Sequence, residues 1–407
     1  MRVLFICHRV PYPPKRGGKI RPFNIIRHLT EKGHRVTVAS LARSRLEREE
    51  ARGLADHCER ALIEIMPNTM AWARMLARLP STMPSSFGYF YSTRLARRVR
   101  AELATRSYDL VFVHCSSVAP YAAAVRGPLK ILDYGDVDSQ KWREYARYKP
   151  FPLSTGFWLE AVKLERAEVR LARGFNVSTC TTRAELDSLR ELGVSGATDW
   201  FPNGVDSDFF QPGTGYDPNL ISFVGRMDYY PNQQAVIEFC GNVLPRLQSR
   251  RPALRFEVVG ADPPDVIRQL ESRPGVTVTG SVPDVRPYVA RAALTVAPLA
   301  IARGTQNKIL ESMAMGVPVV CSSEASRGVD VVAGEQLLAA STANEYVEAI
   351  ETVLGSSEVR ARLARAGRER VLTHHSWNGS MARLDRLLTA AFDRRGRSVT
   401  AADCAIT

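Results

Sequence analysis

Long apolar runs are missing from this sequence, and none approaches the ~20 residues that a membrane-spanning helix needs. The apolar stretch Met1–His8 is too short for a signal peptide and has no small-residue cleavage site, so we expect it to form a first β-strand. The seven cysteines are scattered singly, without a Cys-x-x-Cys pair. This usage argues against a zinc site or a disulfide framework and favours a reducing cytoplasm.

Several binding motifs are absent as well. The loop after the first predicted strand matches neither the Gly-x-Gly-x-x-Gly dinucleotide motif nor the Gly-x-x-x-x-Gly-Lys-Ser/Thr phosphate loop. No spaced set of carboxylates and histidines indicates a metal site. No nucleic-acid-reading motif and no interleaving of basic and aromatic residues is found. We therefore expect no metal cofactor and no nucleic-acid partner.

The composition is that of a globular protein, with 45% of the 407 residues hydrophobic and 24% charged. This length exceeds one comfortable hydrophobic core, so two domains are expected. Charge is uneven: residues 1–200 carry 33 Lys and Arg against 20 Asp and Glu, whereas residues 201–407 carry 22 of each. A basic first half suits nucleic acid, an anionic membrane or an acidic substrate, or reflects surface arginines without a particular role.

Short apolar runs alternate with longer amphipathic stretches, which predicts a doubly wound α/β protein with parallel sheets. The expected strands are residues 3–7, 36–40, 110–114, 130–133, 220–224, 256–260, 276–279, 294–298 and 317–321, and the expected helices include 21–32, 233–250 and 308–315. Turn-forming residues between Trp200 and Pro218 predict a domain boundary. We expect Rossmann-like domains over residues 1–200 and 201–385, then a helix end and a poorly ordered, flexible tail over 386–407. Ligands of open α/β sheets bind beyond the carboxyl ends of the strands, so an interdomain cleft is the expected active site.

Three candidate residues of the first half follow predicted strands. Gly17 and Gly18 stand between a strand and a helix, where backbone N–H groups can approach a phosphate or sugar, although such a pair can also simply make a tight turn. His114 ends a predicted strand at the carboxyl edge of the sheet. It is a candidate for contact with a sugar hydroxyl or with developing positive charge, or it is a hydrogen-bonded strand-end histidine.

An acidic group follows the next strand. Asp133, Asp136 and Asp138 precede a predicted helix. We take Asp136 and Asp138 as candidates for binding an acceptor hydroxyl or acting as a base. A helix cap is the alternative for this group.

Candidates in the second half also lie between strands and helices. Gly225 and Arg226 end a predicted strand, where a permanently charged guanidinium can meet a diphosphate. Gly304 and Thr305 lie in a loop, and Asn307 stands where the next helix begins. A strand, a glycine-containing loop and a helix N-terminus are together the parts of an anion site.

Two charged residues belong to the first turns of that helix. Lys308 opposes the helix dipole unless an anion offsets its charge. Glu311 lies one turn on, where it can accept hydrogen bonds from ribose hydroxyls. Favourable placement of a negative charge near the helix N-terminus is the simpler alternative for Glu311.

These motifs, in this order, resemble the family 4 glycosyltransferases of GT-B fold, and the resemblance runs from Met1 to about Leu388. It is carried by Pro202-Asn203-Gly204-Val205-Asp206, by Val224-Gly225-Arg226, and by Leu310-Glu311-Ser312-Met313-Ala314-Met315-Gly316-Val317-Pro318-Val319-Val320. A narrower match, to sugar transferases associated with exosortase/PEP-CTERM exopolysaccharide loci, is carried by Asp136–Trp142, Met227–Asn232 and Ala302–Lys308.

The resemblance implies a retaining, metal-independent transfer of a hexosyl group from a nucleoside-diphosphate sugar. The implied acceptor is a glycan or a polyprenyl-linked sugar in exopolysaccharide or cell-surface polysaccharide synthesis. Gly18 is expected near the donor phosphates and His114 near the transferred sugar. Arg226 is expected to neutralise the diphosphate, Glu311 to hold the ribose, and the backbone around Val282 to line the base pocket.

The chain departs from the family pattern at two places. The family usually has a Glu eight positions before Glu311, where this chain has Arg303, so the sugar cannot be inferred. It usually has a Lys a few residues after the Gly-Arg pair, where this chain has Pro231 and Asn232. We hypothesise that Lys308 supplies the missing charge from the other side of the site.

The basic first half suggests a peripheral association with the inner face of the plasma membrane. Residues 71–79 and 94–100 combine apolar and basic side chains at helical spacing, which suits an anionic lipid surface near a lipid-linked acceptor. Two other classes of function stay open: a non-catalytic protein that binds nucleotides or polyanions, and a nucleotide-sugar epimerase of the same architecture.

Overall fold

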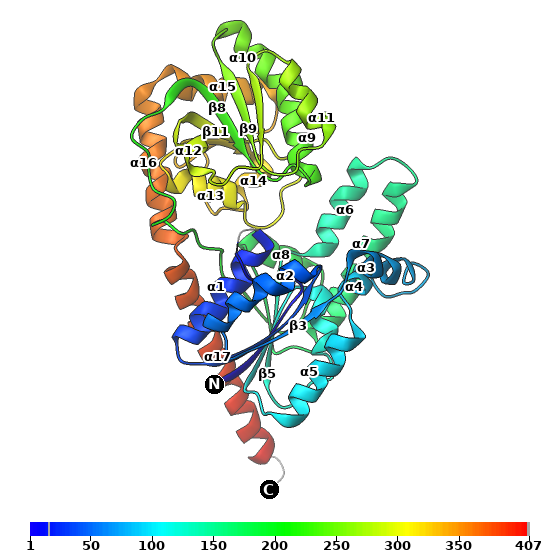
Figure 1. The fold of residues 1–407 in the computed structure, drawn as a ribbon. Coiled ribbons are helices and arrows are strands. Elements are labelled where there is room, and N and C mark those ends of the chain that lie inside the picture. The colour runs from blue at the N-terminus through cyan, green and yellow to red at the C-terminus, as the bar shows by residue number, and fades with distance from the viewer. Residues whose placement is uncertain (15–16, 405–407) are drawn as a thin grey trace. The chain divides into compact units, whose positions relative to one another are not determined.

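The computed structural model describes residues 1–14 and 17–404, which form two compact units (Figure 1). The first unit consists of Met1–Phe201 and the C-terminal residues from Met381 on, and the second of Pro202–Ser380. The return of the chain at Met381 differs from the boundary expected at 385. It occurs because Leu384 and Leu387 of the last helix are buried rather than left at the surface.

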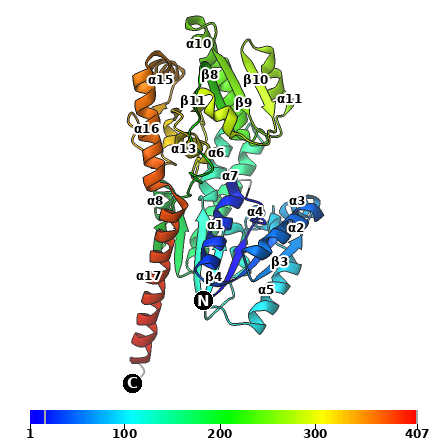
Figure 2. The same ribbon diagram turned by 60° about the vertical axis from the view of Figure 1, so that its left-hand side comes forward.

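The first unit contains a seven-stranded parallel sheet with the order β3-β2-β1-β4-β5-β6-β7. Its strands are β1 (Arg2–Cys7), β2 (Arg35–Ala42), β3 (Arg60–Ile65), β4 (Leu110–His114), β5 (Leu129–Gly135), β6 (Val177–Cys180) and β7 (Ala197–Trp200). Its helices are α1 (Gly17–Glu31), α2 (Arg45–Glu50), α3 (Asn68–Leu76), α4 (Ser85–Tyr89), α5 (Thr93–Thr105), α6 (Asp138–Tyr148), α7 (Leu153–Ala172), α8 (Arg183–Glu191) and, from Met381 on, α17 (Trp377–Cys404), with short 3₁₀ turns η1 (Ala51–Asp56) and η2 (Ser116–Tyr121). Figure 2 shows α17 as one long helix.

The second unit contains a six-stranded parallel sheet with the order β10-β9-β8-β11-β12-β13. Its strands are β8 (Asp217–Val224), β9 (Arg255–Val259), β10 (Val276–Gly280), β11 (Ala292–Ala297), β12 (Val319–Ser322) and β13 (Leu338–Ala340). Its helices are α9 (Tyr230–Glu238), α10 (Leu244–Arg250), α11 (Asp265–Arg268), α12 (Arg286–Ala290), α13 (Asn307–Ala314), α14 (Ser323–Ser326), α15 (Ala343–Gly355) and α16 (Ser357–His374), with short turns η3 (Phe239–Val243) and η4 (Gln269–Ser272).

The predicted α/β architecture is confirmed, because every expected strand is found within a few residues of its predicted ends. The near-continuous apolar runs form central strands buried on both faces; the side chains from Val3 to Ile6 of β1, for example, are fully buried. The sequence analysis missed the short strands β3, β6, β7 and β13. The helix expected over 233–250 is interrupted by a π-helical turn at Phe239–Val243.

Side-chain caps fix where several helices start. Ser92 accepts a hydrogen bond from the backbone amide of Leu95 at the start of α5, and Thr182 accepts one from Glu185 at the start of α8. The last helix, α17, continues through Gly396 to Cys404, where a poorly ordered tail was expected. The last three residues of the expected tail, 405–407, lie outside the described residues. In the described part of the chain, no helix combines the length and apolar character that crossing a membrane requires.

Candidate functional site

Each sheet has one point at which the strand order reverses: strands on one side of it are added in one direction, and later strands are added on the other side. In the first unit this switch lies between β1 and β4, and in the second between β8 and β11. Open parallel sheets bind ligands beyond the carboxyl ends of the strands at such a point. Near these points the chain has Gly17 and Gly18 at the start of α1, His114 at the end of β4, Gly225 and Arg226 after β8, and residues 298–308 from the end of β11 to the start of α13. The topology therefore brings these candidates to the expected edge of each sheet.

In the second unit, Lys308 reaches from α13 to the segment that follows β8. Its ammonium nitrogen lies 2.6 Å from Oδ1 of Asn232 and 4.5 Å from the centroid of the Phe223 ring. Nδ2 of Asn232 donates a hydrogen bond of 2.7 Å to the backbone carbonyl of Arg226. Lys308 is thus held beside Asn232, which stands where the family pattern has a lysine.

Gly225 leaves room for this arrangement. A Cβ atom on Gly225 would lie 2.7 Å from Nδ2 of Asn232 and 3.0 Å from Nζ of Lys308. Gly260, after β9, makes an even closer approach, because a Cβ there would lie 1.8 Å from the carbonyl oxygen of Gly225. Backbone and side chains therefore converge on the end of β8 without space for larger residues.

Arg226 is held by acidic neighbours of its own unit. Its guanidinium makes a two-point contact with Asp228, at 3.0 and 2.7 Å, and also bonds Asp262. These bonds use Nε and Nη2 of Arg226, so its Nη1 group can donate to phosphate oxygens while the two carboxylates compete with a diphosphate for the same positive charge. Asp228 and Asp262 would thus compete with the diphosphate for Arg226, and the sequence did not reveal this competition.

Lys308 and Glu311 lie on consecutive turns of α13 and influence each other's charge. Burial lowers the pKa of Lys308 to about 7, and the negative charge of Glu311 opposes this shift. Burial raises the pKa of Glu311 to about 7, against the attraction of Lys308. No hydrogen bond joins the Glu311 carboxylate to the described residues, so its oxygens are available to a ligand.

The loop before α13 contains polar atoms that the protein leaves unsatisfied. Oγ1 of Thr305 and Oδ1 of Asn307 are buried and have no hydrogen-bond partner among the described residues. Leaving such atoms unpaired costs about 1–3 kcal/mol each, so a ligand that pairs with them gains affinity. Gly304, just before them, has a φ of +63°, which favours glycine. Thr305 and Asn307 therefore each present a buried oxygen atom without a hydrogen-bond partner among the described residues.

Val282 lies further from the switch point than the other candidates. It follows β10, the edge strand, which is separated from β8 by β9. Gly280 turns the chain there with a φ of +72°, and Val282 is half-buried. The sheet order therefore places Val282 away from Lys308 and Glu311, toward the edge of the same carboxyl end.

In the first unit, Asp133 is the centre of a buried polar network. Its carboxylate accepts two hydrogen bonds of 2.8 Å from Arg21, one of 2.7 Å from Nδ1 of His114 and one of 2.9 Å from Thr179. Burial alone would raise the pKa of Asp133. The Arg21 guanidinium and the hydrogen bonds from Arg21 and His114 outweigh burial and hold this pKa well below its usual range. The Arg21 side chain also stacks on Phe201, at 3.7 Å from the ring centroid.

This network determines how His114 presents its ring. Because Nδ1 donates to Asp133, the neutral ring carries no hydrogen on Nε2. The ring of His8, which follows β1, lies 5.7 Å from that of His114, and a Cβ on Gly18 would lie 3.9 Å from His8. Burial lowers the pKa of His8 well below its usual range, and His114 adds to that shift. His8, His114 and Gly18 are therefore neighbours.

Sequence reasoning missed His8, Arg21 and Asn232 as site residues. A polar residue directly after the first strand was a usable signal for His8. No local pattern marks Arg21, because its partner Asp133 lies 112 positions away in the sequence.

Asp136 and Asp138 belong to the same edge but make different contacts. Asp136 accepts a hydrogen bond of 3.1 Å from the Thr181 hydroxyl. Asp138 is the first residue of α6, and the side chain of the cap residue Val137 makes no capping hydrogen bond, whereas its backbone amide donates to the Glu185 carboxylate. The Asp138 carboxylate lies 3.8 Å from the Cys115 sulfur, and burial raises its pKa. Neither aspartate therefore supplies the side-chain helix cap considered as their alternative role.

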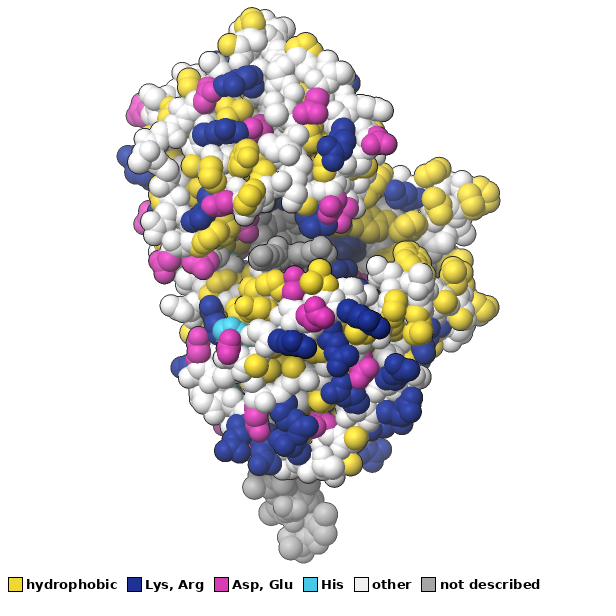
Figure 3. Space-filling model, in the orientation of Figure 1, with side chains coloured by type: hydrophobic (Ala, Val, Ile, Leu, Met, Phe, Trp, Pro, Cys, Tyr) yellow, Lys and Arg dark blue, Asp and Glu magenta, His cyan; other side chains and the backbone are white. Residues whose placement is uncertain are grey.

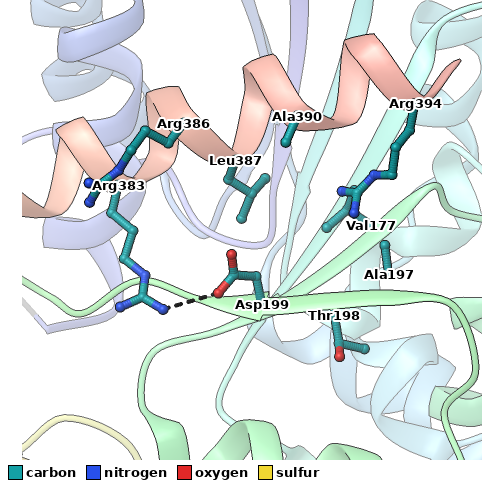
Figure 4. A pocket seen from close by; sticks show the side chains of 9 residues that line it. All are labelled: Val177, Ala197, Thr198, Asp199, Arg383, Arg386, Leu387, Ala390 and Arg394. Carbon is teal, nitrogen blue, oxygen red and sulfur yellow. Dashed lines mark hydrogen bonds and ion pairs between the residues drawn. The ribbon is translucent and has the colours of Figure 1, made fainter. Parts of the chain in front are cut away.

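A cavity of about 320 Å³ lies elsewhere in the first unit, between α17 and the last two strands (Figure 4). Its lining includes Val177 and Ala197, the first residues of β6 and β7, and therefore extends to the amino ends of these parallel strands. Arg383 in its wall is paired with Asp199 at 3.1 Å. This cavity lies away from the carboxyl edge, where ligands of such sheets bind.

Among the described residues, no group of three or more His, Cys, Asp and Glu side chains is placed to hold a metal ion. The absence of a metal cofactor stays a prediction.

Two family models match this chain. Residues 16–209 match the model described as Glycosyltransferase Family 4, and residues 218–356 match the model described as Glycosyl transferases group 1. The first match lies mainly in the first unit, and the second lies within the second unit. Among curated proteins, none matches the sequence.

Solved structures share the fold over nearly the whole chain. A sucrose-phosphate synthase from Thermosynechococcus elongatus superposes with a TM-score of 0.72 at 18% identity, covering 96% of this chain and 100% of that one. The HepE protein of Anabaena, solved in complex with UDP-glucose, superposes with a TM-score of 0.66 at 16% identity, with coverage of 96% and 100%. HepE has also been solved in complex with UDP. At these identities the likeness establishes the fold.

Proposed function

We propose that this chain, a glycosyltransferase of the GT-B type, transfers a sugar from a nucleoside-diphosphate donor with retention of configuration and without a metal ion. The proposed acceptor is a glycan or lipid-linked sugar in the synthesis of exopolysaccharide or another cell-surface polysaccharide. The family models and the two Rossmann-like units give the class of enzyme. The finer assignments rest on the chemistry of the carboxyl edge of each sheet.

The observation that supports the donor site most directly is the position of Lys308. Its ammonium group, the amide of Asn232 and the N-terminus of α13 meet at the switch point of the second sheet. Positive charge and unpaired N–H groups at a helix N-terminus favour phosphate. The unpaired oxygen atoms of Thr305 and Asn307 add partners for a polar ligand. We infer that the diphosphate lies against this edge.

Glu311 would complete the nucleotide site. Its carboxylate lies one turn into α13 from Lys308 and has no hydrogen-bond partner among the described residues. A carboxylate in this position can accept hydrogen bonds from both hydroxyls of a ribose. UDP is the first donor base to test, because the similar HepE protein was solved with UDP and UDP-glucose.

The reaction breaks the bond between the anomeric carbon and the diphosphate, so negative charge builds up on the departing phosphate. Lys308, the α13 N-terminus and Arg226 would stabilise that charge in the role that a metal ion plays in other enzymes. Losing one preorganised group of this kind raises the activation barrier by about 3 kcal/mol. The proposed metal independence rests on these groups.

The first unit would contribute groups for the transferred sugar, the donor phosphates and the acceptor. Asp133 fixes the His114 ring so that Nε2 can accept a hydrogen bond from a sugar hydroxyl. Gly18, near His8, leaves the backbone at the start of α1 accessible to a ligand. Asp136 and Asp138 are the proposed contacts for the acceptor hydroxyl, and burial raises the pKa of Asp138 above its usual range.

Thermal unfolding in the presence of UDP, GDP, ADP and CMP tests the donor site. A ligand at 100 times its dissociation constant adds about 2.7 kcal/mol of apparent stability. We expect one nucleoside diphosphate to stabilise the protein selectively, and Glu311→Gln and Lys308→Met to abolish that effect. Glu358→Gln and Arg327→Met, at exposed positions of the same unit, are the matched controls. If none of the nucleotides stabilises the protein, the alternative hypothesis of a non-catalytic polyanion-binding protein is favoured.

Incubation with the selected nucleotide-sugar separates transfer from epimerisation. Release of an altered nucleotide-sugar without any acceptor would identify an epimerase. Incorporation of labelled sugar into a lipid-extractable or polymeric product would support the proposed transfer. The configuration of the new bond, read from the anomeric coupling constant, tests retention.

A further inference from the structure

Exposed hydrophobic side chains are concentrated in one part of the first unit. Ten of the eighteen large hydrophobic side chains that are exposed in the described chain lie within residues 70–83 and 148–159. They are Met70, Trp72, Leu76, Leu79, Met83, Tyr148, Phe151, Leu153, Trp158 and Leu159. In Figure 3, hydrophobic side chains gather on the right-hand side of the view, over α3, α4 and the hairpin of α6 and α7. We call this set the apolar patch.

The most exposed member of the apolar patch is at the tip of the helical hairpin. α6 ends at Tyr148 and α7 begins at Leu153, and the connection is Lys149-Pro150-Phe151-Pro152. Phe151 is 83% exposed, more than any other large hydrophobic residue in the described chain. An aromatic side chain at the tip of a helical hairpin is poorly placed for packing within its own unit.

The two segments of the apolar patch form one body. The ammonium group of Lys163 in α7 donates to the carbonyl of Leu79, at 2.8 Å. The Glu160 carboxylate accepts hydrogen bonds from the backbone amides of Ser85 and Ser86 at the start of α4. Phe87 of α4 is buried against Leu164 of α7. The apolar patch is therefore a continuous, preformed surface.

The charges around the apolar patch are mostly of one sign. Residues 68–92 and 141–166 together contain eight Lys and Arg but three Asp and Glu. Two of those three acids are used within the unit, because Glu160 caps α4 and Glu165 is paired with Arg143. Residues 68–92 contain no acidic residue. An apolar surface rimmed by positive charge complements an anionic bilayer, whose headgroups attract lysine and arginine while its acyl chains take up the apolar side chains.

A groove beside the hairpin tip has the chemistry of a headgroup site. It has a volume of about 450 Å³ and is lined by Arg143, Ala146, Arg147, Ser154, Thr155 and Trp158. Nε of Arg143 is buried without a hydrogen-bond partner, so this guanidinium retains a donor for a ligand. Two guanidinium groups with two hydroxyls match the oxygens of a phosphate, and tryptophan favours the membrane–water interface.

We propose that the apolar patch docks the protein on an anionic phospholipid surface, with Phe151 and Leu153 inserted among the lipids and a headgroup phosphate in the groove between α6 and α7. The proposal rests on the first unit alone and does not depend on the transfer reaction.

This assignment moves the expected lipid contact away from α5. Residues 94–100 were expected to contribute apolar and basic side chains together. Leu95, Ala96 and Val99 are buried in the core of the first unit, because α5 packs on its sheet. α5 therefore offers charge but no apolar surface for insertion. The expectation for residues 71–79 agrees with the exposure of Trp72 and Leu76.

Co-sedimentation with lipid vesicles tests the proposal. The full chain should bind phosphatidylcholine vesicles that contain phosphatidylglycerol, bind pure phosphatidylcholine at least tenfold more weakly, and lose affinity as salt rises. Phe151→Ser with Leu153→Ser should weaken binding at least tenfold by removing the inserted side chains. Arg143→Gln with Arg147→Gln should weaken it tenfold or more, at about fivefold for each charge near the surface.

Two matched double variants serve as controls. Arg94→Gln with Arg97→Gln removes two exposed charges from α5, and should cost less than the groove pair. Leu46→Ser with Leu372→Ser removes two exposed apolar side chains outside the apolar patch and should leave binding unchanged. Melting temperatures close to wild type establish that each variant is folded. Quenching by brominated lipid adds a local readout, because it should fall in Trp158→Phe.

Other results would overturn the proposal. If Phe151→Ser with Leu153→Ser (the tip variant) binds vesicles as well as wild type does, general charge attraction suffices. The same conclusion follows if Arg94→Gln with Arg97→Gln loses as much affinity as Arg143→Gln with Arg147→Gln. Dimerisation that the tip variant abolishes, without lipid binding, would assign the apolar patch to a second copy of the chain. No binding to either kind of vesicle would refute the lipid assignment outright.

Discussion

The ammonium nitrogen of Lys308, at the start of α13, lies 2.6 Å from Oδ1 of Asn232 in α9. Asn232 stands where the family 4 glycosyltransferases usually carry a lysine. Lys308 of α13 therefore places a positive charge beside that position. The sequence hypothesis that Lys308 compensates for the missing lysine therefore has a geometric basis. Its effect on a bound diphosphate is testable.

Lys308→Met should lower the rate of transfer strongly while leaving the fold intact. Loss of one preorganised charge costs about 3 kcal/mol, or roughly 10²-fold in kcat. The free energy of unfolding should stay the same or rise, because a buried ammonium group is replaced by an apolar side chain. Steady-state kinetics and urea unfolding measure the two effects. An unchanged dissociation constant for the nucleotide together with an unchanged kcat would contradict the assignment.

Binding of a nucleoside diphosphate should take up protons at pH 8. Burial lowers the pKa of Lys308 to about 7, so the free amine is mostly neutral there, and a bound diphosphate favours its protonated form. Affinity from this group should be fully present below pH 7 and fall as the pH rises through 7. Titration calorimetry in two buffers of different ionisation enthalpy gives the proton count, which should drop in Lys308→Met.

The raised pKa of Glu311 should limit the same affinity on the acid side. Its carboxyl titrates at about pH 7 in the free protein, and only its ionised form accepts two ribose hydroxyl hydrogens. Affinity should therefore rise with pH up to about 7 through this group and be greatest near neutrality. In Glu311→Gln the acid limb of the profile should disappear; its persistence would exclude Glu311 as the titrating group.

Arg21→Met should destabilise the first unit by about 3–5 kcal/mol, because it leaves the Asp133 carboxylate buried without its cation. The pKa of Asp133 is depressed in the folded protein, so its contribution is present above its unfolded pKa, near 4, and is lost as the pH falls through the folded value. Urea unfolding at pH 7 and pH 3 measures this. Arg27→Met, half-exposed on the same helix, is the control. A loss below 1 kcal/mol at pH 7 would contradict the prediction.

Gly225→Ala should impair activity more than Gly241→Ala. The added methyl group at position 225 would lie within 3.0 Å of both Asn232 and Lys308, and so must displace one of them. At position 241 no atom lies within 4 Å of the added carbon. Transfer rates and unfolding curves of the two variants separate loss of the site from loss of stability. Equal rates would mean that the Lys308 position is unimportant.

Individual strands and loops were predictable because their signals are local. The apolar runs of β1, β4 and β8 are buried on both faces, and such runs identify central strands of parallel sheets. The short strands β6, β7 and β13 were missed because three or four residues give too little pattern. The membership of α17 in the first unit was missed because the sequence of an amphipathic helix does not indicate which surface its apolar side covers.

The sequence by itself determined the α/β class, the strand-ending loops and the kinds of residues at the site, since these follow from apolar periodicity, glycine placement and the order of motifs. The tertiary structure alone decided which of these residues meet. Arg21 and Asp133 are 112 positions apart, and Lys308 and Asn232 are 76 apart. It also decided that α5 buries its apolar side whereas α3 exposes Trp72. Contacts across such separations depend on which strands become neighbours in a sheet, and local preferences do not contain that information.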